Sequence, residues 1–104
     1  MEKIVKQGLL YDFYGALLNT HQQEIYEAYV YENLSLSEIA LSKGVSRQGI
    51  HDIIKRCDKS LDEYENKLHL VERFIKIKEE VANIKKISSQ QEIIDIADDI
   101  LGQL

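Results

Sequence analysis

Apolar residues recur every three or four positions along almost the whole chain, and no proline interrupts them. This spacing places the apolar side chains on one face of an α-helix, and proline is the residue that most strongly disrupts a helix. Long helices are therefore favoured, with ends that are set by capping residues. A chain of 104 residues is long enough for one core and too short for two ordinary domains. The sequence predicts an all-α fold.

The N-terminal part of this fold is expected to contain two helices. Residues 4–18 carry apolar side chains at helical spacing, and the helix they form ends at Asn19. Thr20 and Gln23 have the spacing of a capping box, in which each side chain bonds the backbone N–H of the other residue. We therefore expect Thr20 to cap a second helix that continues to about Tyr31.

Residues 34–60 have the outline of a helix-turn-helix. Ser35 and Glu38 form a stronger capping box, which opens a short helix. Gly44 follows where a left-handed residue would end that helix, and Ser46 is placed to cap the next one. A helix of two turns, a glycine turn and a new serine-capped helix define this motif. The residues expected to fill the small core between its two helices are Ile39, Ala40, Val45, Ile50 and Ile53 or Ile54.

The helix that starts at Arg47 has no obvious end before about residue 86. Its apolar stripe moves round the helix by one residue near residues 67–70. The helix therefore bends or breaks there, or it is buried on two faces beyond that point. We favour one long helix, or two nearly collinear ones. The pair Ser88-Ser89 is expected to cap a short final helix.

The chain is expected to form one domain with an extension. Residues 1–66 form the helical domain that contains the helix-turn-helix, and residues 67–104 are a C-terminal helical extension of that domain. A chain this short cannot easily cover both apolar stripes of the long helix, so we predict a homodimer through about residues 61–84. The alternative is that the final helix folds back and covers the stripes.

Charge is unevenly distributed along the chain. The net charge is −5, but residues 35–60 carry five Lys or Arg against three Asp or Glu, a net of +2. Residues 1–34 and 61–104 are both acidic. Such a protein does not coat nucleic acid by bulk attraction, although its one positive segment would turn toward a polyanion.

Composition argues against several other classes of protein. No apolar run approaches the length of a membrane span, and the N-terminus lacks the apolar stretch of a secretory signal. A lone cysteine, Cys57, cannot form an intramolecular disulfide and fits the reducing cytoplasm. Neither a metal-ligand spacing nor a catalytic arrangement is visible. We predict a cytoplasmic protein without a cofactor, a metal or enzymatic activity.

The helix that starts at Arg47 has two opposed faces. Its apolar face carries Ile50, Ile53, Ile54, Cys57 and Leu61, and its polar face carries Arg47, Gln48, His51, Asp52, Lys55 and Lys59. Arginine and glutamine can contact guanine and adenine edges in the major groove, while lysine reaches phosphates. We therefore predict a double-stranded DNA site. Its expected base-reading residues are Arg47, Gln48 and His51, and its expected phosphate contacts are Lys43, Ser46, Lys55, Lys59, Ser35 and Ser37.

Two motifs make this chain resemble known families. The run Leu34-Ser-Leu-Ser-Glu-Ile-Ala followed by Gly-Val-Ser-Arg-Gln-Gly-Ile resembles region 4 of bacterial sigma factors, and the likeness extends back to residue 22. With residues 9–18, 45–52 and 64–68 added, the chain is similar to the YlxM family of small helix-turn-helix proteins of Gram-positive bacteria. The resemblance implies an all-α fold, DNA binding, transcription regulation and a link to the signal recognition particle. One departure is Gly49, where alanine is common, which should loosen the recognition helix by up to about 1 kcal/mol.

A second interpretation stays open, because any surface helix has a polar face. Asp52 on that face, and the acidic residues elsewhere, weigh against DNA binding. In this alternative, the protein is an interaction module for the signal recognition particle GTPase or for RNA polymerase, and the helix-turn-helix is its scaffold.

Overall fold

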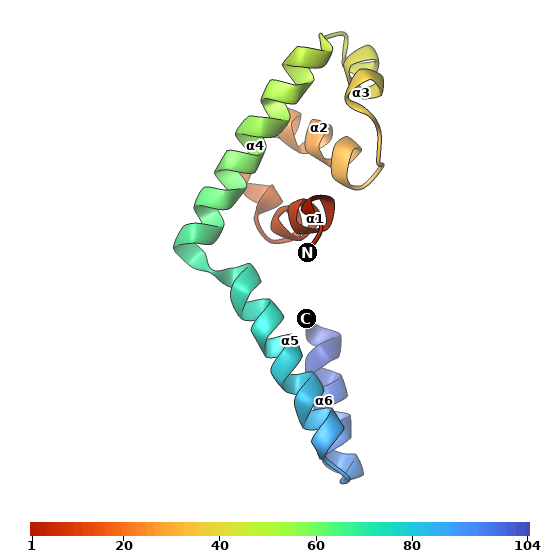
Figure 1. Cartoon of the computed structure of the whole chain (residues 1–104), viewed down its shortest axis with the longest axis vertical. Helices are drawn as coiled ribbons and strands as arrows, with labels where there is room; N and C mark the ends of the chain where they lie inside the picture. Colours follow the sequence, from red (N-terminus) through yellow and green to blue (C-terminus); the bar gives the residue numbers. More distant parts are fainter. The chain divides into compact units, whose positions relative to one another are not determined.

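The computed structural model describes all 104 residues and contains six α-helices, one 3₁₀ turn and no β-strand (Figure 1). The prediction of an all-α fold is confirmed. In chain order the elements are α1 (Lys3–Tyr14), η1 (Gly15–Leu17), α2 (Thr20–Val30), α3 (Leu36–Lys43), α4 (Arg47–Leu68), α5 (Leu70–Ile87) and α6 (Gln91–Gln103).

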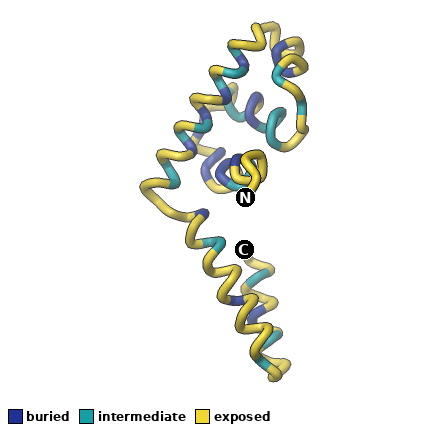
Figure 2. The backbone as a smooth tube through the Cα atoms, viewed as in Figure 1, coloured by how far each residue is buried: buried dark blue, intermediate teal, exposed yellow.

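The chain divides into two compact units, Met1–Leu68 and His69–Leu104, which we call the N-terminal unit and the C-terminal unit. In the N-terminal unit, α4 contacts each of α1, α2 and α3. Its buried side chains follow one another at helical spacing, and Figure 2 shows them in dark blue along the helix. The side chains of this unit that are less than 2% exposed are Tyr14, Tyr26, Ile25, Ile39, Ile50, Leu61 and Cys57.

The helix-turn-helix is formed by α3 and α4, with the boundaries expected from its caps. Ser35 Oγ accepts from the backbone N–H of Glu38, and the Glu38 carboxylate accepts from the N–H of Ser35, both at 3.1 Å. Gly44 adopts the left-handed conformation with φ 68° and ψ 30°. Ser46 Oγ accepts from the N–H of Gly49 at 2.9 Å, which caps α4. All three local predictions are confirmed.

The core between α3 and α4 differs from the expected one at a single position. Ile39, Ala40, Ile50 and Ile54 are buried as expected, whereas Val45 is 42% exposed. Val45 follows the left-handed glycine, and its backbone N–H donates to the Ala40 carbonyl at 3.1 Å. This bond, from an N–H to the carbonyl five residues earlier, is the one that closes a helix end in the Schellman motif. The backbone of Val45, and not its side chain, is what closes the turn.

The N-cap of α2 lies one residue before the expected one. Asn19, not Thr20, is the N-cap, and it forms a capping box with Gln22. Asparagine is at least as good a cap as threonine. The side chain of Gln23 is also engaged elsewhere, because its Nε2 donates to the carbonyl oxygens of Gly15 and Leu18. The prediction of a Thr20–Gln23 capping box is therefore wrong, although the helix that it was expected to cap is present.

The prediction of a single long helix is also wrong, because α4 ends at Leu68 and α5 begins at Leu70. Between them His69 adopts a left-handed conformation with φ 57°. The break falls in the window where the apolar stripe changes phase. A left-handed residue interrupts the regular rotation of the helix, and this accounts for the change of phase.

The C-terminal unit is a pair of packed helices, α5 and α6. Lys85 Nζ and Asp98 Oδ1 form an ion pair across it at 2.7 Å. The final helix thus folds back on its neighbour, as the alternative to the homodimer anticipated, but it leaves part of the apolar stripe uncovered, since Ile77 and Ile84 are 43% and 42% exposed. The Ser88-Ser89 cap is wrong, because Gln90 is the N-cap of α6. Ser88 Oγ instead accepts from the N–H of Gln90 within the connection.

None of the six helices combines the length and the apolar composition that crossing a bilayer requires.

Candidate nucleic-acid interface

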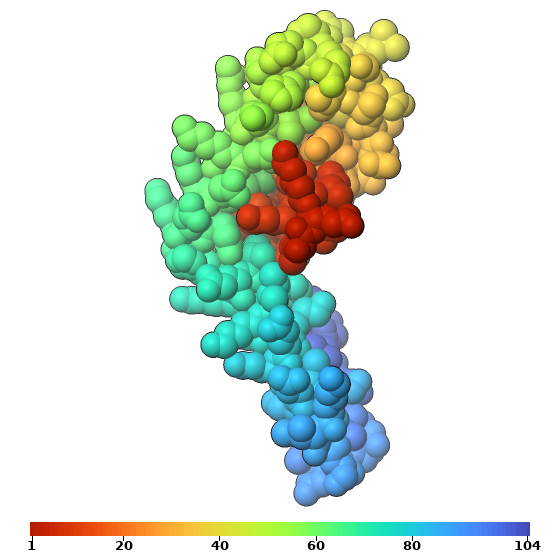
Figure 3. Space-filling view, in the orientation of Figure 1, coloured from red at the N-terminus to blue at the C-terminus, as the bar shows by residue number.

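The first half of α4 presents the expected polar face to solvent. Arg47, Gln48, Lys55 and Lys59 are exposed, and the His51 side chain is 43% exposed. On the other side of the same helix, Ile50 and Cys57 are completely buried. Figure 3 shows long side chains of α4, coloured green, extending into solvent along the helix. The structure therefore brings five of the nine expected site residues together on one helix face.

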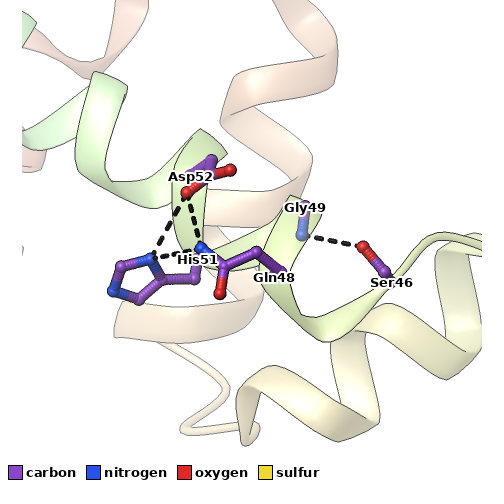
Figure 4. Close-up of polar contacts among 5 residues, drawn as sticks. All are labelled: Ser46, Gln48, Gly49, His51 and Asp52. Carbon is purple, nitrogen blue, oxygen red and sulfur yellow. Dashed lines mark hydrogen bonds and ion pairs between the residues drawn. The ribbon is translucent and has the colours of Figure 1, made fainter.

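The middle of this face is a cluster of three polar side chains. Gln48 Nε2 donates to Asp52 Oδ1 at 2.9 Å. His51 Nδ1 lies 3.5 Å from the same carboxylate oxygen and 3.5 Å from Gln48 Nε2. Figure 4 shows the three side chains converging over the first turns of α4, near the bond from the N–H of Gly49 to Ser46. A carboxylate thus lies among the residues that were expected to read bases.

Lys43, at the end of α3, is already paired within the chain. Its Nζ lies 2.9 Å from Glu24 Oε2 on α2. The hydrogen bond from Lys43, and then its positive charge, lower the pKa of the Glu24 carboxyl. Lys43 would have to exchange this partner for a phosphate, so its charge contributes less to anion binding than an unpaired lysine would.

The serines before and within α3 are less well placed for a phosphate than the sequence suggested. The hydroxyl oxygen and the backbone N–H of Ser35 are both used in the capping box. The Glu38 carboxylate occupies the N-terminus of α3, and the hydrogen bond from the Ser35 backbone lowers its pKa. This carboxylate would repel a phosphate at the same helix end. Ser37 is exposed, and the Ser46 oxygen is used as a cap.

Asp52 and Arg56 also lie on or near this face, although neither was among the expected site residues. Asp52 was noted only as an unfavourable charge, although the four-residue spacing of Gln48 and Asp52 is one at which side chains on a helix meet. Arg56 is exposed on α4 and adds one more cation near the polar face. Of the two, only Asp52 carried a signal in its spacing.

The fold and this helix face define a helix-turn-helix protein: two short-linked helices with a glycine turn and a second helix whose polar side faces solvent. The structure groups no three His, Cys, Asp or Glu side chains where a metal ion could bind.

Sequence comparison places the chain within that class. A family model described as "Putative helix-turn-helix protein, YlxM / p13 like" matches residues 1–100, and the chain belongs to this family, UPF0122. A UPF0122 protein of Symbiobacterium thermophilum is 41% identical over 98 residues, covering 94% of this chain and 86% of that protein. A Thermoanaerobacter relative is 49% identical over 78 residues, which cover 75% of this chain and 67% of that protein. A Bacillus thuringiensis relative is 39% identical over 95 residues, with 91% and 86% covered.

Proposed function

We propose that this protein is a DNA-binding regulator that acts by binding and catalyses no reaction. It inserts the N-terminal half of α4 into the major groove of double-stranded DNA. Arg47, Gln48 and His51 contact base edges, because the N-terminal residues of the second helix reach the bases in such motifs. Lys55 and Lys59 contact phosphates. Ser46, Lys43, Ser35 and Ser37 are secondary contacts in this proposal, because the first three already have partners within the chain.

The observation that supports this proposal most directly is the two-sided character of α4. The helix is anchored through buried Ile50, Ile54 and Cys57, and this fixes which side chains point outward. Those side chains include the cations Arg47, Lys55 and Lys59 of residues 35–60, which have a net charge of +2 in a chain whose total charge is −5. Long-range attraction would then help to bring this face toward DNA.

The test is selection of bound duplexes from fragmented genomic DNA at low salt, followed by affinity measurements on the selected sequence. We expect Arg47→Ala to cost about 1–3 kcal/mol and to relax the base preference at one position. Lys55→Ala should weaken binding to all sequences and lower the slope of log K against log salt by about one unit. Lys67→Ala is a matched control, because it removes a charge about 18 Å further along the same helix.

The two outcomes are distinct. Loss of base preference in Arg47→Ala, with Lys67→Ala close to wild type, supports the proposal. If no fragment is enriched by the protein even at low salt, DNA binding by α4 is ruled out.

A second candidate function is supported by a hollow between α2 and α3. This hollow has a volume of about 400 Å³, and its lining includes the apolar Leu34 and Ile39. Its charged lining residues are Glu24, Glu27 and Glu32 together with Lys43, which is paired with Glu24, so the lining is net acidic. An acidic, partly apolar hollow suits a basic protein segment better than DNA. In this candidate function the protein docks on the signal recognition particle GTPase or on RNA polymerase. Partners captured by the intact protein and retained after nuclease treatment would favour it over DNA binding.

A further inference from the structure

Asp52 is the one carboxylate on the outward face of α4 between Arg47 and Lys59. It lies one turn beyond Gln48, and its side chain is 54% exposed. The hydrogen bond from Gln48 Nε2 to Asp52 Oδ1, at 2.9 Å, determines the orientation of the Gln48 amide. Only the amide nitrogen can donate to a carboxylate, so Gln48 Oε1 is left to face away from Asp52 (Figure 4).

The chemistry of a carboxylate limits what it can contact in DNA. An ionised carboxylate only accepts hydrogen bonds, and it is repelled by phosphates and by carbonyl oxygens. The donors on major-groove base edges are the amino groups, N6 of adenine and N4 of cytosine. Thymine O4 and guanine O6, the groups at the corresponding places, are acceptors. A carboxylate on this face therefore favours amino bases and disfavours keto bases.

The Gln48 amide is also compatible with a preference for an amino base. One of its two N–H groups is bonded to Asp52 at 2.9 Å, and Nε2 also lies 3.5 Å from His51 Nδ1. If His51 turns to the DNA, the other N–H and Oε1 can both reach a base. This remaining pair matches adenine, whose N7 accepts and whose N6 donates. Asp52 thus orients Gln48 for adenine and also supplies an acceptor of its own.

On the basis of the proposed DNA binding, we propose that Asp52 is a specificity-determining residue of the α4 interface. Together with Gln48, it selects a base pair that turns the amino group of adenine or cytosine toward α4, and it rejects the reversed pair, which presents a keto oxygen. Adenine is preferred to cytosine because of Gln48. The negative charge of Asp52 repels phosphates, but in this proposal it is the source of a base preference and not a defect in the DNA-binding surface.

The experiment is selection from a random duplex library with the full-length wild type, Asp52→Asn and Glu63→Gln, followed by dissociation constants on four duplexes that differ at the selected pair. Asp52→Asn keeps the shape of the side chain but gives it a donor and removes the charge. Glu63→Gln removes the same charge from an exposed position about 16 Å further along α4. Circular dichroism of each variant checks that the helices are intact.

We expect the wild type to show one position at which A and C exceed G and T by roughly tenfold. Asp52→Asn should reduce this ratio to about twofold and should bind the keto duplexes more tightly than wild type does. Glu63→Gln should keep the wild-type ratio. If Asp52→Asn retains the ratio, or if wild type selects DNA without any such position, the role of Asp52 is overturned while DNA binding stands. If wild type binds no duplex, the proposed function fails and the role of Asp52 falls with it.

Discussion

At the scale of single residues, the orientation of α4 depends on buried polar contacts as well as on its apolar stripe. Asp58 accepts hydrogen bonds from Gln7 Nε2 on α1, at 3.0 and 3.1 Å, and from the Tyr26 hydroxyl on α2. Burial, and then the hydrogen bond to Asp58, raise the pKa of Tyr26 far above its usual value. Because these bonds are directional, they fix the rotation of α4 and with it the face that carries the candidate site.

Tyr26→Phe tests this contact. We expect a loss of about 1–2 kcal/mol in the free energy of unfolding, because a hydrogen bond to a charged group is removed from a buried site while Asp58 keeps Gln7 as a partner. Urea denaturation at neutral pH measures it. Tyr29→Phe, on the same helix, is the control, since the hydrogen bonds to Asp58 come from Gln7 and Tyr26. Equal losses in the two variants would show that the Asp58 contact contributes nothing.

At the scale of elements, short-range caps determine where α3 and α4 begin and end. The partners lie three residues apart in both Ser35–Glu38 and Ser46–Gly49. Such pairs can be recognised in a sequence because both members share one turn. The N-cap of α2 was misplaced, because Asn19 and Thr20 are both good caps and the Gln23 side chain bonds back to Gly15 and Leu18 instead of to Thr20.

Gly44→Ala tests the turn between these helices. There is open space around the position, so the cost is conformational: φ is +68°, a region that places a Cβ close to the following carbonyl. We expect a loss of about 1–2 kcal/mol in urea denaturation. Gly8→Ala in α1, also with open space, should instead stabilise by up to about 1 kcal/mol, because alanine favours a helix interior. A stabilising Gly44→Ala would contradict the role of the glycine turn.

At the scale of the whole molecule, the C-terminal unit is too small to bury its own apolar side chains. Its buried residues are Val71, Val81 and Ala97, whereas Ile77, Ile84, Ile93, Ile96, Ile100 and Leu104 are each at least 37% exposed. Independent folding below about 40 residues usually requires oligomerisation or covalent links. Charge also differs between its helices, since α5 has a net charge of +2 and α6 of −4. A two-fold dimer can place α5 of each copy against α6 of the other.

We therefore expect a homodimer in solution, with an interface that includes α6 as well as the part of residues 61–84 that lies in α5. Ile77→Glu should convert it to a monomer, because a charge replaces an apolar side chain in the interface. Asn83→Glu adds the same charge at an exposed polar position and should remain dimeric. Sedimentation velocity measures both. A wild-type monomer at high micromolar concentration would contradict the dimer.

The sequence was sufficient for the features that depend on neighbours within a few residues: the helical class, the caps at Ser35 and Ser46, and the turn at Gly44. It also separated the two faces of α4, because periodicity alone reveals them. Only the tertiary structure decided that Lys43 pairs with Glu24 and that Asp58 joins Gln7 to Tyr26. Contacts between residues 19 to 51 positions apart have no periodic signal, because they depend on how the helices pack.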